Sequence, residues 1–170
     1  MLGYISAEGR GAGDVLLTQV AEALRIKAVP LAGAVQVNRE HDPALKCDMD
    51  LHILSGTDVI RISQNLGALS RGCRLDPAGL EQAVGLVAQA LDHGPRLLIV
   101  NKYGKQEIDG RGFRPVIAEA LMRDIPVLLS VNAGNVPAFL DFAGDMAAPV
   151  SATRDAVLDW VQQVTTAQSL

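Results

Sequence analysis

The run Arg96-Leu97-Leu98-Ile99-Val100-Asn101 decides the fold class. It is short and almost wholly apolar, which is typical of a strand buried on both faces of a sheet. A second run of this kind, Ile125–Val131, follows it, and the segment between them, Phe113–Arg123, has helical spacing. Strands that alternate with helices predict a three-layer α/β domain with a mostly parallel sheet.

The same alternation extends toward the N-terminus. Asp76-Pro77 places an N-cap residue before a proline at the first helical position, so we expect a helix from there to about Asp92. Before it, Leu2–Ser6 and Leu31–Val37 are predicted strands, and a predicted helix from about Asp14 to Lys27 joins them, with Asp14 as its N-cap.

Two further regions complete the predicted layout. Cys47–Leu54 and Val59–Ser63 flank a turn, which predicts an antiparallel hairpin added to the sheet. Toward the C-terminus we expect a short helix over Asn135–Ala143, an edge strand over Ala148–Val150 and an amphipathic helix over Thr153–Val164. An unpaired edge strand, or the apolar face of the last helix, could make a homodimer.

Composition narrows the class of protein. A length of 170 residues suits one domain over 1–170, and 49% hydrophobic residues can form a sizeable core. The net charge of −4 argues against binding to nucleic acid or to an anionic membrane. The sequence has no apolar run near the ~18 residues that span a bilayer and no secretory signal, so we expect a cytoplasmic protein. Cys47 and Cys73 form neither a disulfide framework nor a zinc motif, and the three histidines suggest no metal site.

Ligands of such sheets bind beyond the carboxyl ends of the strands. The loop after the first strand is rich in glycine, and its residues are candidates for binding an anion through backbone N–H groups and the helix dipole: Glu8, Gly9, Arg10, Gly11, Ala12, Gly13 and Asp14. A true P-loop reads G-x-x-x-x-G-K-[ST]. Here Gly13 and Asp14 replace its Lys and its Ser or Thr, so a plain Gly-rich turn into a helix is an equal alternative.

Cations also gather in the predicted ligand-edge loops. Residues 61–114 carry eight basic and five acidic residues, a net charge of +3, while the rest of the chain is at −7. Such a segregation favours binding of an anion, although solvated loop charges would give the same pattern. The candidate ligand-binding cations, besides Arg10, are Arg61, Arg71, Arg74, Lys102, Arg111 and Arg114.

The segment after the buried strand is a candidate catalytic region. Asn101 can bind a ligand, Lys105 can stabilise charge on a phosphoryl group, and Glu107 is the nearby candidate for a general base. The alternative for Glu107 is a solvated loop carboxylate. Asp48 and Asp50 share one strand face and could hold a hard cation, but the polar face of a hairpin is the more ordinary interpretation.

Several of these stretches resemble the uncharacterised bacterial domain-of-unknown-function family numbered 2478. The stretches are Glu8–Gly11 with Asp14, Cys47–Leu51, Ile60–Gln64 through Arg71–Asp76, and Val100–Glu107 with Gly110–Arg114. The family is similar in layout to small P-loop nucleoside-triphosphatases with degenerate Walker motifs. In that comparison Val100–Glu107 aligns with a V-D-E-I-G-K-M-E segment, whose acidic pair is replaced here by Asn101-Lys102.

The resemblance implies a small anionic ligand, namely a nucleotide, a phosphate or an oxyanion. The leading hypothesis is nucleotide binding at a degenerate P-loop with weak or absent hydrolysis, in which Mg²⁺ would be a cofactor only together with the nucleotide. The alternatives are an active nucleoside-triphosphatase with rearranged catalytic residues, using Lys105 and Glu107, and an accessory protein that binds an oxyanion in molybdenum metabolism. The last rests on family members encoded near molybdate uptake genes.

Overall fold

The computed structural model describes residues 1–39, 47–64 and 74–168. Their strands form one seven-stranded sheet in the order β4-β3-β2-β5-β6-β1-β7. The strands β1 (Leu2–Ile5), β2 (Leu31–Arg39), β5 (Leu97–Val100), β6 (Val127–Ser130) and β7 (Ala147–Pro149) are mutually parallel. The predicted α/β fold with a mostly parallel sheet is therefore confirmed, and its layout is consistent with a P-loop NTPase-like fold.

The predicted hairpin is present and is part of a larger antiparallel extension. β3 (Asp48–Ile53) pairs antiparallel with β4 (Val59–Arg61) and also with β2, where Asn38 lies opposite Met49. β4 therefore runs in the same direction as β2. Its carboxyl end and the start of β3 consequently lie at the edge of the sheet where the parallel strands end.

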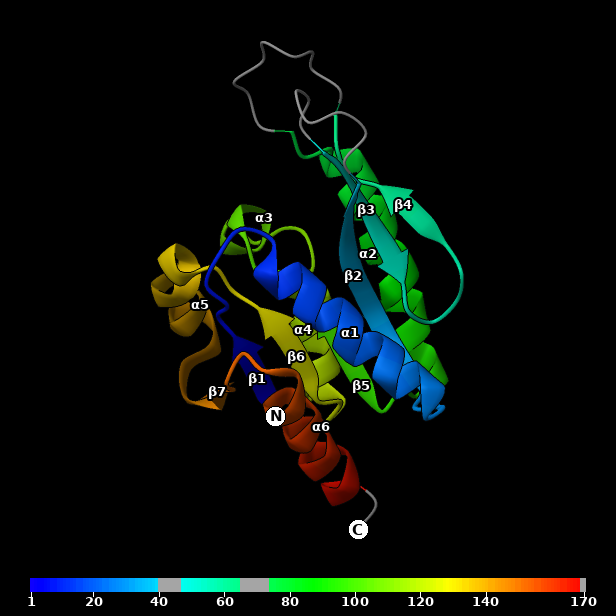
Figure 1. Cartoon of the computed structure of the whole chain (residues 1–170), viewed down its shortest axis with the longest axis vertical. Coiled ribbons are helices and arrows are strands. Elements are labelled where there is room, and N and C mark those ends of the chain that lie inside the picture. Colours follow the sequence, from blue (N-terminus) through cyan, green and yellow to red (C-terminus); the bar gives the residue numbers. More distant parts are fainter. Residues whose placement is uncertain (40–46, 65–73, 169–170) are drawn as a thin grey trace.

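Helices cover both faces of the sheet (Figure 1). On one face lie α1 (Ala12–Ile26) and α6 (Arg154–Ala167), and on the other lie α2 (Pro77–Ala90) and α4 (Arg114–Met122). Phe139 of α5 (Val136–Ala143) packs into the core on the face that α2 and α4 cover. α3 (Lys105–Ile108) is one short turn after β5. Three short 3₁₀ helices are also present in the described segments: η1 (Leu91–His93), η2 (Ala133–Asn135) and η3 (Gly144–Met146).

Burial follows the sequence pattern closely. All four residues of β5 and of β6 are buried, as expected for central strands with helices on both sides. Asp76 caps α2 by accepting the Ala78 N–H at 3.0 Å, as predicted. On α6, Val157, Val161 and Val164 are buried, so the apolar face of this helix packs within the chain itself.

Among the described residues, no helix is long and apolar enough to cross a membrane. Two expectations from the sequence, on the start of α1 and on the segment after β5, are wrong. Helix α1 begins before Asp14, with Gly11 as its N-cap in the left-handed region at φ 75°. In addition, Glu107 is not a solvated loop carboxylate, because it is buried in the helical turn Lys105–Ile108 and accepts the Gly104 N–H that precedes this turn.

Gly33 lets β2 pair with β5 opposite Ile99 without a steric clash. Its φ of +115° lies in the region that favours glycine, and a Cβ there would lie 1.8 Å from the carbonyl oxygen of Ile99. We predict that Gly33→Ala lowers the free energy of unfolding by about 2–4 kcal/mol in urea denaturation. The matched control is Gly85→Ala in the exposed middle of α2, where a Cβ meets nothing within 4 Å. It should stabilise the protein by about 0.5–1 kcal/mol. Equal effects of the two substitutions would contradict the close approach.

Candidate functional site

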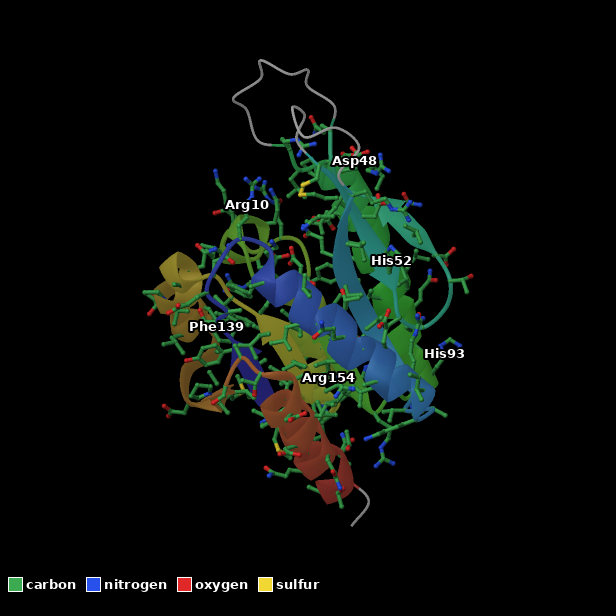
Figure 2. The ribbon with its side chains drawn as sticks, in the orientation of Figure 1. Arg10, Asp48, His52, His93, Phe139 and Arg154 are labelled. Atoms are coloured by element: carbon green, nitrogen blue, oxygen red, sulfur yellow. The ribbon has the colours of Figure 1, made fainter. Side chains whose placement is uncertain are left out.

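A cavity of about 410 Å³ opens at the sheet edge where the parallel strands end. Its wall combines the N-terminus of α1, the ends of β2 and β5, the start of β3 and the segment after β4. Predicted site residues from distant parts of the chain meet in it: Arg10, Gly11, Asp14, Arg74, Asn101, Lys102, Lys105 and Glu107. Figure 2 shows Arg10 toward the same end of the molecule as Asp48, with His93 toward the other end.

The centre of the site is the buried carboxylate of Asp14, in the first turn of α1. Asn101 Nδ2 donates to Asp14 Oδ1 at 2.7 Å, and Asn38 Nδ2 donates to Asp14 Oδ2 at 3.0 Å. The Lys102 ammonium lies 3.7 Å from Oδ1. Each carboxylate oxygen therefore has an amide donor, and a nearby cation balances the charge, which are the conditions that permit a buried carboxylate.

The amides that hold Asp14 are themselves fixed. Asn101 Oδ1 accepts the backbone N–H of Gln36 at 3.0 Å, and Asn38 Oδ1 accepts from Gln36 Nε2 at 2.8 Å. Three elements, α1, β2 and the end of β5, are thereby joined around one charge. The sequence analysis assigned Asn101 to the site but missed Gln36, which looked like an ordinary residue inside the predicted strand Leu31–Val37, and Asn38, which lay just beyond that predicted strand.

The N-terminus of α1 is open toward the cavity. The Ala12 N–H donates to the Gly9 carbonyl at 3.4 Å, but the N-cap, Gly11, has no side chain to accept from the other first-turn N–H groups, and Gly11 and Arg10 line the cavity. Uncapped N–H groups at a helix start, with the positive end of the helix dipole, favour an anion. The other predicted loop residues lie beside this turn: Glu8 and Gly9 are exposed, while Ala12 and Gly13 are partly buried.

The cations fall into two groups. Arg10, Arg74, Lys102 and Lys105 line the cavity, and within the described segments neither Arg10 nor Lys105 has an ion-pair partner. Arg74 Nη1 also donates to the carbonyl of Cys47 at 2.5 Å, which ties the segment before α2 to the start of β3.

Three predicted cations lie elsewhere. Arg61 pairs with Asp48 at 3.1 Å and with Asp50, on the strand face away from Met49, and its hydrogen bond to Asp50 raises its pKa. Arg111 pairs with Asp109, and Arg114 donates to the carbonyls of Glu107 and Ile108 and lies over the Phe142 ring. None of these three candidate ligand-binding cations lines the cavity. Arg71 and Cys73 lie outside the described residues.

Asp48 and Asp50 form the polar face of the antiparallel extension, as the ordinary interpretation predicted. Asp50 is buried between Arg39, at 3.2 Å, and Arg61. Among the described residues, there is no group of three or more His, Cys, Asp or Glu side chains that could hold a metal ion.

Glu107 lines the cavity but is buried and engaged with backbone. Its Oε2 accepts the Gly104 N–H at 2.9 Å and its Oε1 accepts the Phe113 N–H at 3.1 Å. Burial raises the pKa of the Glu107 carboxyl, and the two backbone N–H groups oppose that shift. A carboxylate in this position holds the segment 104–113 closed and so positions Lys105 at the cavity.

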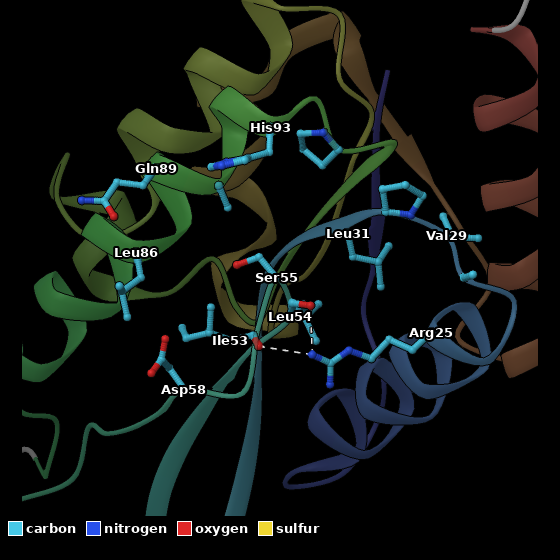
Figure 3. A pocket seen from close by; sticks show the side chains of 14 residues that line it. Arg25, Val29, Leu31, Ile53, Leu54, Ser55, Asp58, Leu86, Gln89 and His93 are labelled. Carbon is cyan, nitrogen blue, oxygen red and sulfur yellow. Dashed lines mark hydrogen bonds between the residues drawn. The ribbon is translucent and has the colours of Figure 1, made fainter.

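A second cavity, of about 560 Å³, lies at the opposite edge of the sheet (Figure 3). There the Arg25 guanidinium, at the end of α1, donates to the carbonyls of Leu54 at 2.9 Å and Gly56 at 2.7 Å. None of the predicted site residues lies here. The contacts of Arg25 fasten α1 to the turn between β3 and β4.

Comparison with known proteins identifies the family of this chain. Residues 2–160 match the model of the family described as "Protein of unknown function (DUF2478)". The chain belongs to this family. It is also similar to the molybdenum import ATP-binding protein ModC 2 of Bradyrhizobium diazoefficiens, with 32% identity over 148 residues, or 86% of this chain. The matched part is 16% of that relative, so this chain spans only a small fraction of its length. No solved structure matches.

The Asp14 network can be tested by placing at position 101 the acidic residue found there in the V-D-E-I-G-K-M-E segment with which Val100–Glu107 aligns. We predict that Asn101→Asp lowers the free energy of unfolding by about 3–5 kcal/mol near neutral pH, because it sets an unpaired carboxylate against the buried Asp14. Urea denaturation measures this, with the exposed Asn132→Asp as control. A neutral effect of Asn101→Asp would mean that the network does not hold the site.

The Glu107 carboxyl leads to a pH prediction. Its folded pKa is raised, so the folded state keeps this proton at pH values where the unfolded state has lost it. Its contribution to stability is therefore greatest below the ordinary glutamate pKa and falls as pH rises to the raised value. We expect Glu107→Gln to remove this fall in urea denaturation series, whereas Glu22→Gln, on the exposed face of α1, should keep it. An unchanged pH profile in Glu107→Gln would refute the assignment.

Proposed function

We propose that this chain binds a nucleotide or another phosphate-bearing anion in the cavity at the start of α1, with weak or absent hydrolysis. The observation that carries the proposal is the meeting of an uncapped helix N-terminus with four cationic side chains in one cavity. Helix N–H groups and Arg or Lys side chains are the standard donors to phosphate oxygens. The relative's printed name, an ATP-binding protein, agrees with such a ligand.

The same geometry argues against efficient hydrolysis. Asp14 stands where a P-loop has the hydroxyl that holds Mg²⁺, and both of its oxygens already accept amide donors. Glu107, the candidate for orienting water, has each oxygen engaged with a backbone N–H. We propose that cations of the protein supply the charge that Mg²⁺ supplies in a P-loop enzyme.

Titration calorimetry with ATP, GTP and pyrophosphate, each with and without Mg²⁺, tests this proposal. We expect binding that does not require Mg²⁺, and about tenfold weaker binding in Lys105→Ala, which removes a charged donor from the cavity. Lys27→Ala, at the other end of α1, is the matched control and should bind as the unchanged protein does. No heat with any of the three ligands at millimolar concentration would overturn the proposal.

The alternative of an active nucleoside-triphosphatase is tested on the same samples. Phosphate release that disappears in both Lys105→Ala and Glu107→Ala would support it and would replace the proposal of weak hydrolysis. Release that survives both substitutions would exclude these two residues as its catalytic groups.

A second candidate function is the binding of an oxyanion in molybdenum metabolism. The chain matches a segment of a protein named for molybdenum import, and that segment is joined there to a much longer chain. The four cations of the cavity would suit molybdate as well as phosphate. A rise in melting temperature with molybdate or tungstate, and none with nucleotides, would favour this candidate, since a ligand at 100 Kd adds about 2.7 kcal/mol.

A further inference from the structure

The cavity at the start of α1 has two chemically different sides. One side carries the cations Arg10, Arg74, Lys102 and Lys105, and we call it the cationic wall. The other, which we call the apolar wall, comes from the antiparallel extension, from α2 and from the residue before α4. It consists of Met49, Ile62, Leu75, Leu80 and Phe113. The Walker-like features of the sequence concern the cationic wall alone.

The apolar wall is a continuation of the core. Ile62, Leu80 and Phe113 are 3%, 5% and 1% exposed and belong to the core on the α2 face of the sheet. Met49 and Leu75 are partly buried and pack against that core from the cavity side. These two side chains therefore offer apolar surface that is fixed in place before any ligand arrives.

An inorganic anion would use only half of such a cavity. Phosphate or pyrophosphate would contact the cationic wall and leave the apolar wall exposed to water. No apolar surface would then be buried on binding. A cavity of about 410 Å³ is within the usual range for organic ligands, which are held by apolar surface and oriented by a few polar groups. The two walls together fit a molecule with an anionic end and an apolar body.

Other groups that line the cavity favour a ligand with an aromatic ring over one with an alkyl chain. Gln106 also lines the cavity, and a side-chain amide can exchange hydrogen bonds with the edge atoms of a heterocycle. The thioether of Met49, on the apolar wall, and the guanidinium of Arg74, on the cationic wall, are both groups that can contact an aromatic face favourably. A long alkyl chain would have no use for these polar groups.

We infer that the ligand is an organic phosphate with a planar heterocycle, and that the heterocycle lies against Met49 and Leu75 while the phosphates face the cationic wall. The inference rests on the proposed function and adds to it the chemical class of the ligand and the place of its organic part. The antiparallel extension thus becomes a binding element and not only an addition to the sheet.

Methyl NMR on protein labelled at the methionine methyl groups gives a direct test. The chain has four methionines, and the other three, Met1, Met122 and Met146, are more than half exposed and do not line the cavity. We expect ATP to shift the Met49 methyl resonance through the ring current of adenine. The other three resonances should stay in place, and tripolyphosphate should shift the Met49 resonance far less than ATP.

Calorimetry on variants supplies the second readout, with ATP and tripolyphosphate as the probes. Met49→Ala and Leu75→Ala should each weaken ATP binding five- to tenfold and leave tripolyphosphate binding unchanged. Lys105→Ala should weaken both ligands, and Met146→Ala, away from the cavity, should weaken neither. Because Met49 and Leu75 are only partly buried, their variants should fold, and circular dichroism checks this.

The outcomes separate the two levels of the argument. Equal affinity for ATP and tripolyphosphate, with the Met49 methyl unmoved, overturns the heterocycle site and leaves anion binding intact. Tighter binding of ATP that neither Met49→Ala nor Leu75→Ala weakens also overturns it, because the ring then binds elsewhere. Failure of both ligands to bind, together with failure of GTP and pyrophosphate, overturns the proposed function, and the heterocycle site falls with it.

Discussion

A single buried charge constrains the functional edge of this protein. The Asp14 carboxylate can remain buried only while two amides and a lysine compensate it, and these groups come from β2 and from the end of β5. The requirement fixes where α1 begins relative to two strands distant in the sequence. The open N-terminus of α1 and the cations around it are consequently held in one arrangement, and the cavity exists because of that arrangement.

This arrangement explains how a P-loop-like layout can lack the residues that define a P-loop. In place of a lysine within the loop, Lys102 and Lys105 follow a different strand and line the same cavity. In place of a hydroxyl, a carboxylate bonds to asparagines of the protein itself. In the proposed function the layout still faces an anion, while Asp14 and Glu107 are bonded to groups of their own chain.

Much of the fold could be predicted from sequence because its signals are local. The apolar runs at β5 and β6 and the Asp76-Pro77 start of α2 depend on neighbouring residues, and the structure has all three. The start of α1 was misplaced because Asp14 resembles an N-cap in sequence, while its carboxylate is bonded to side chains far along the chain. No spacing rule reveals such a partner.

The candidate site divides in the same way. The cations of the loops were identified by type, and four of them line the cavity. Arg61 was not separable from them, because its ion pairs depend on which face of β4 it occupies. Gln36, Asn38 and the apolar wall went unnoticed for a related reason: each is an ordinary strand or core residue until the end of β2, the start of β3 and the end of β4 meet in space.

The two fastenings of α1 have a mechanical consequence. Its first turn is bonded to Asn38 and Asn101 through Asp14, and its last turn is bonded to the β3–β4 turn through Arg25. A helix anchored at both ends resists sliding along its axis. Displacing α1 along its axis would therefore have to break hydrogen bonds at both of its ends at once.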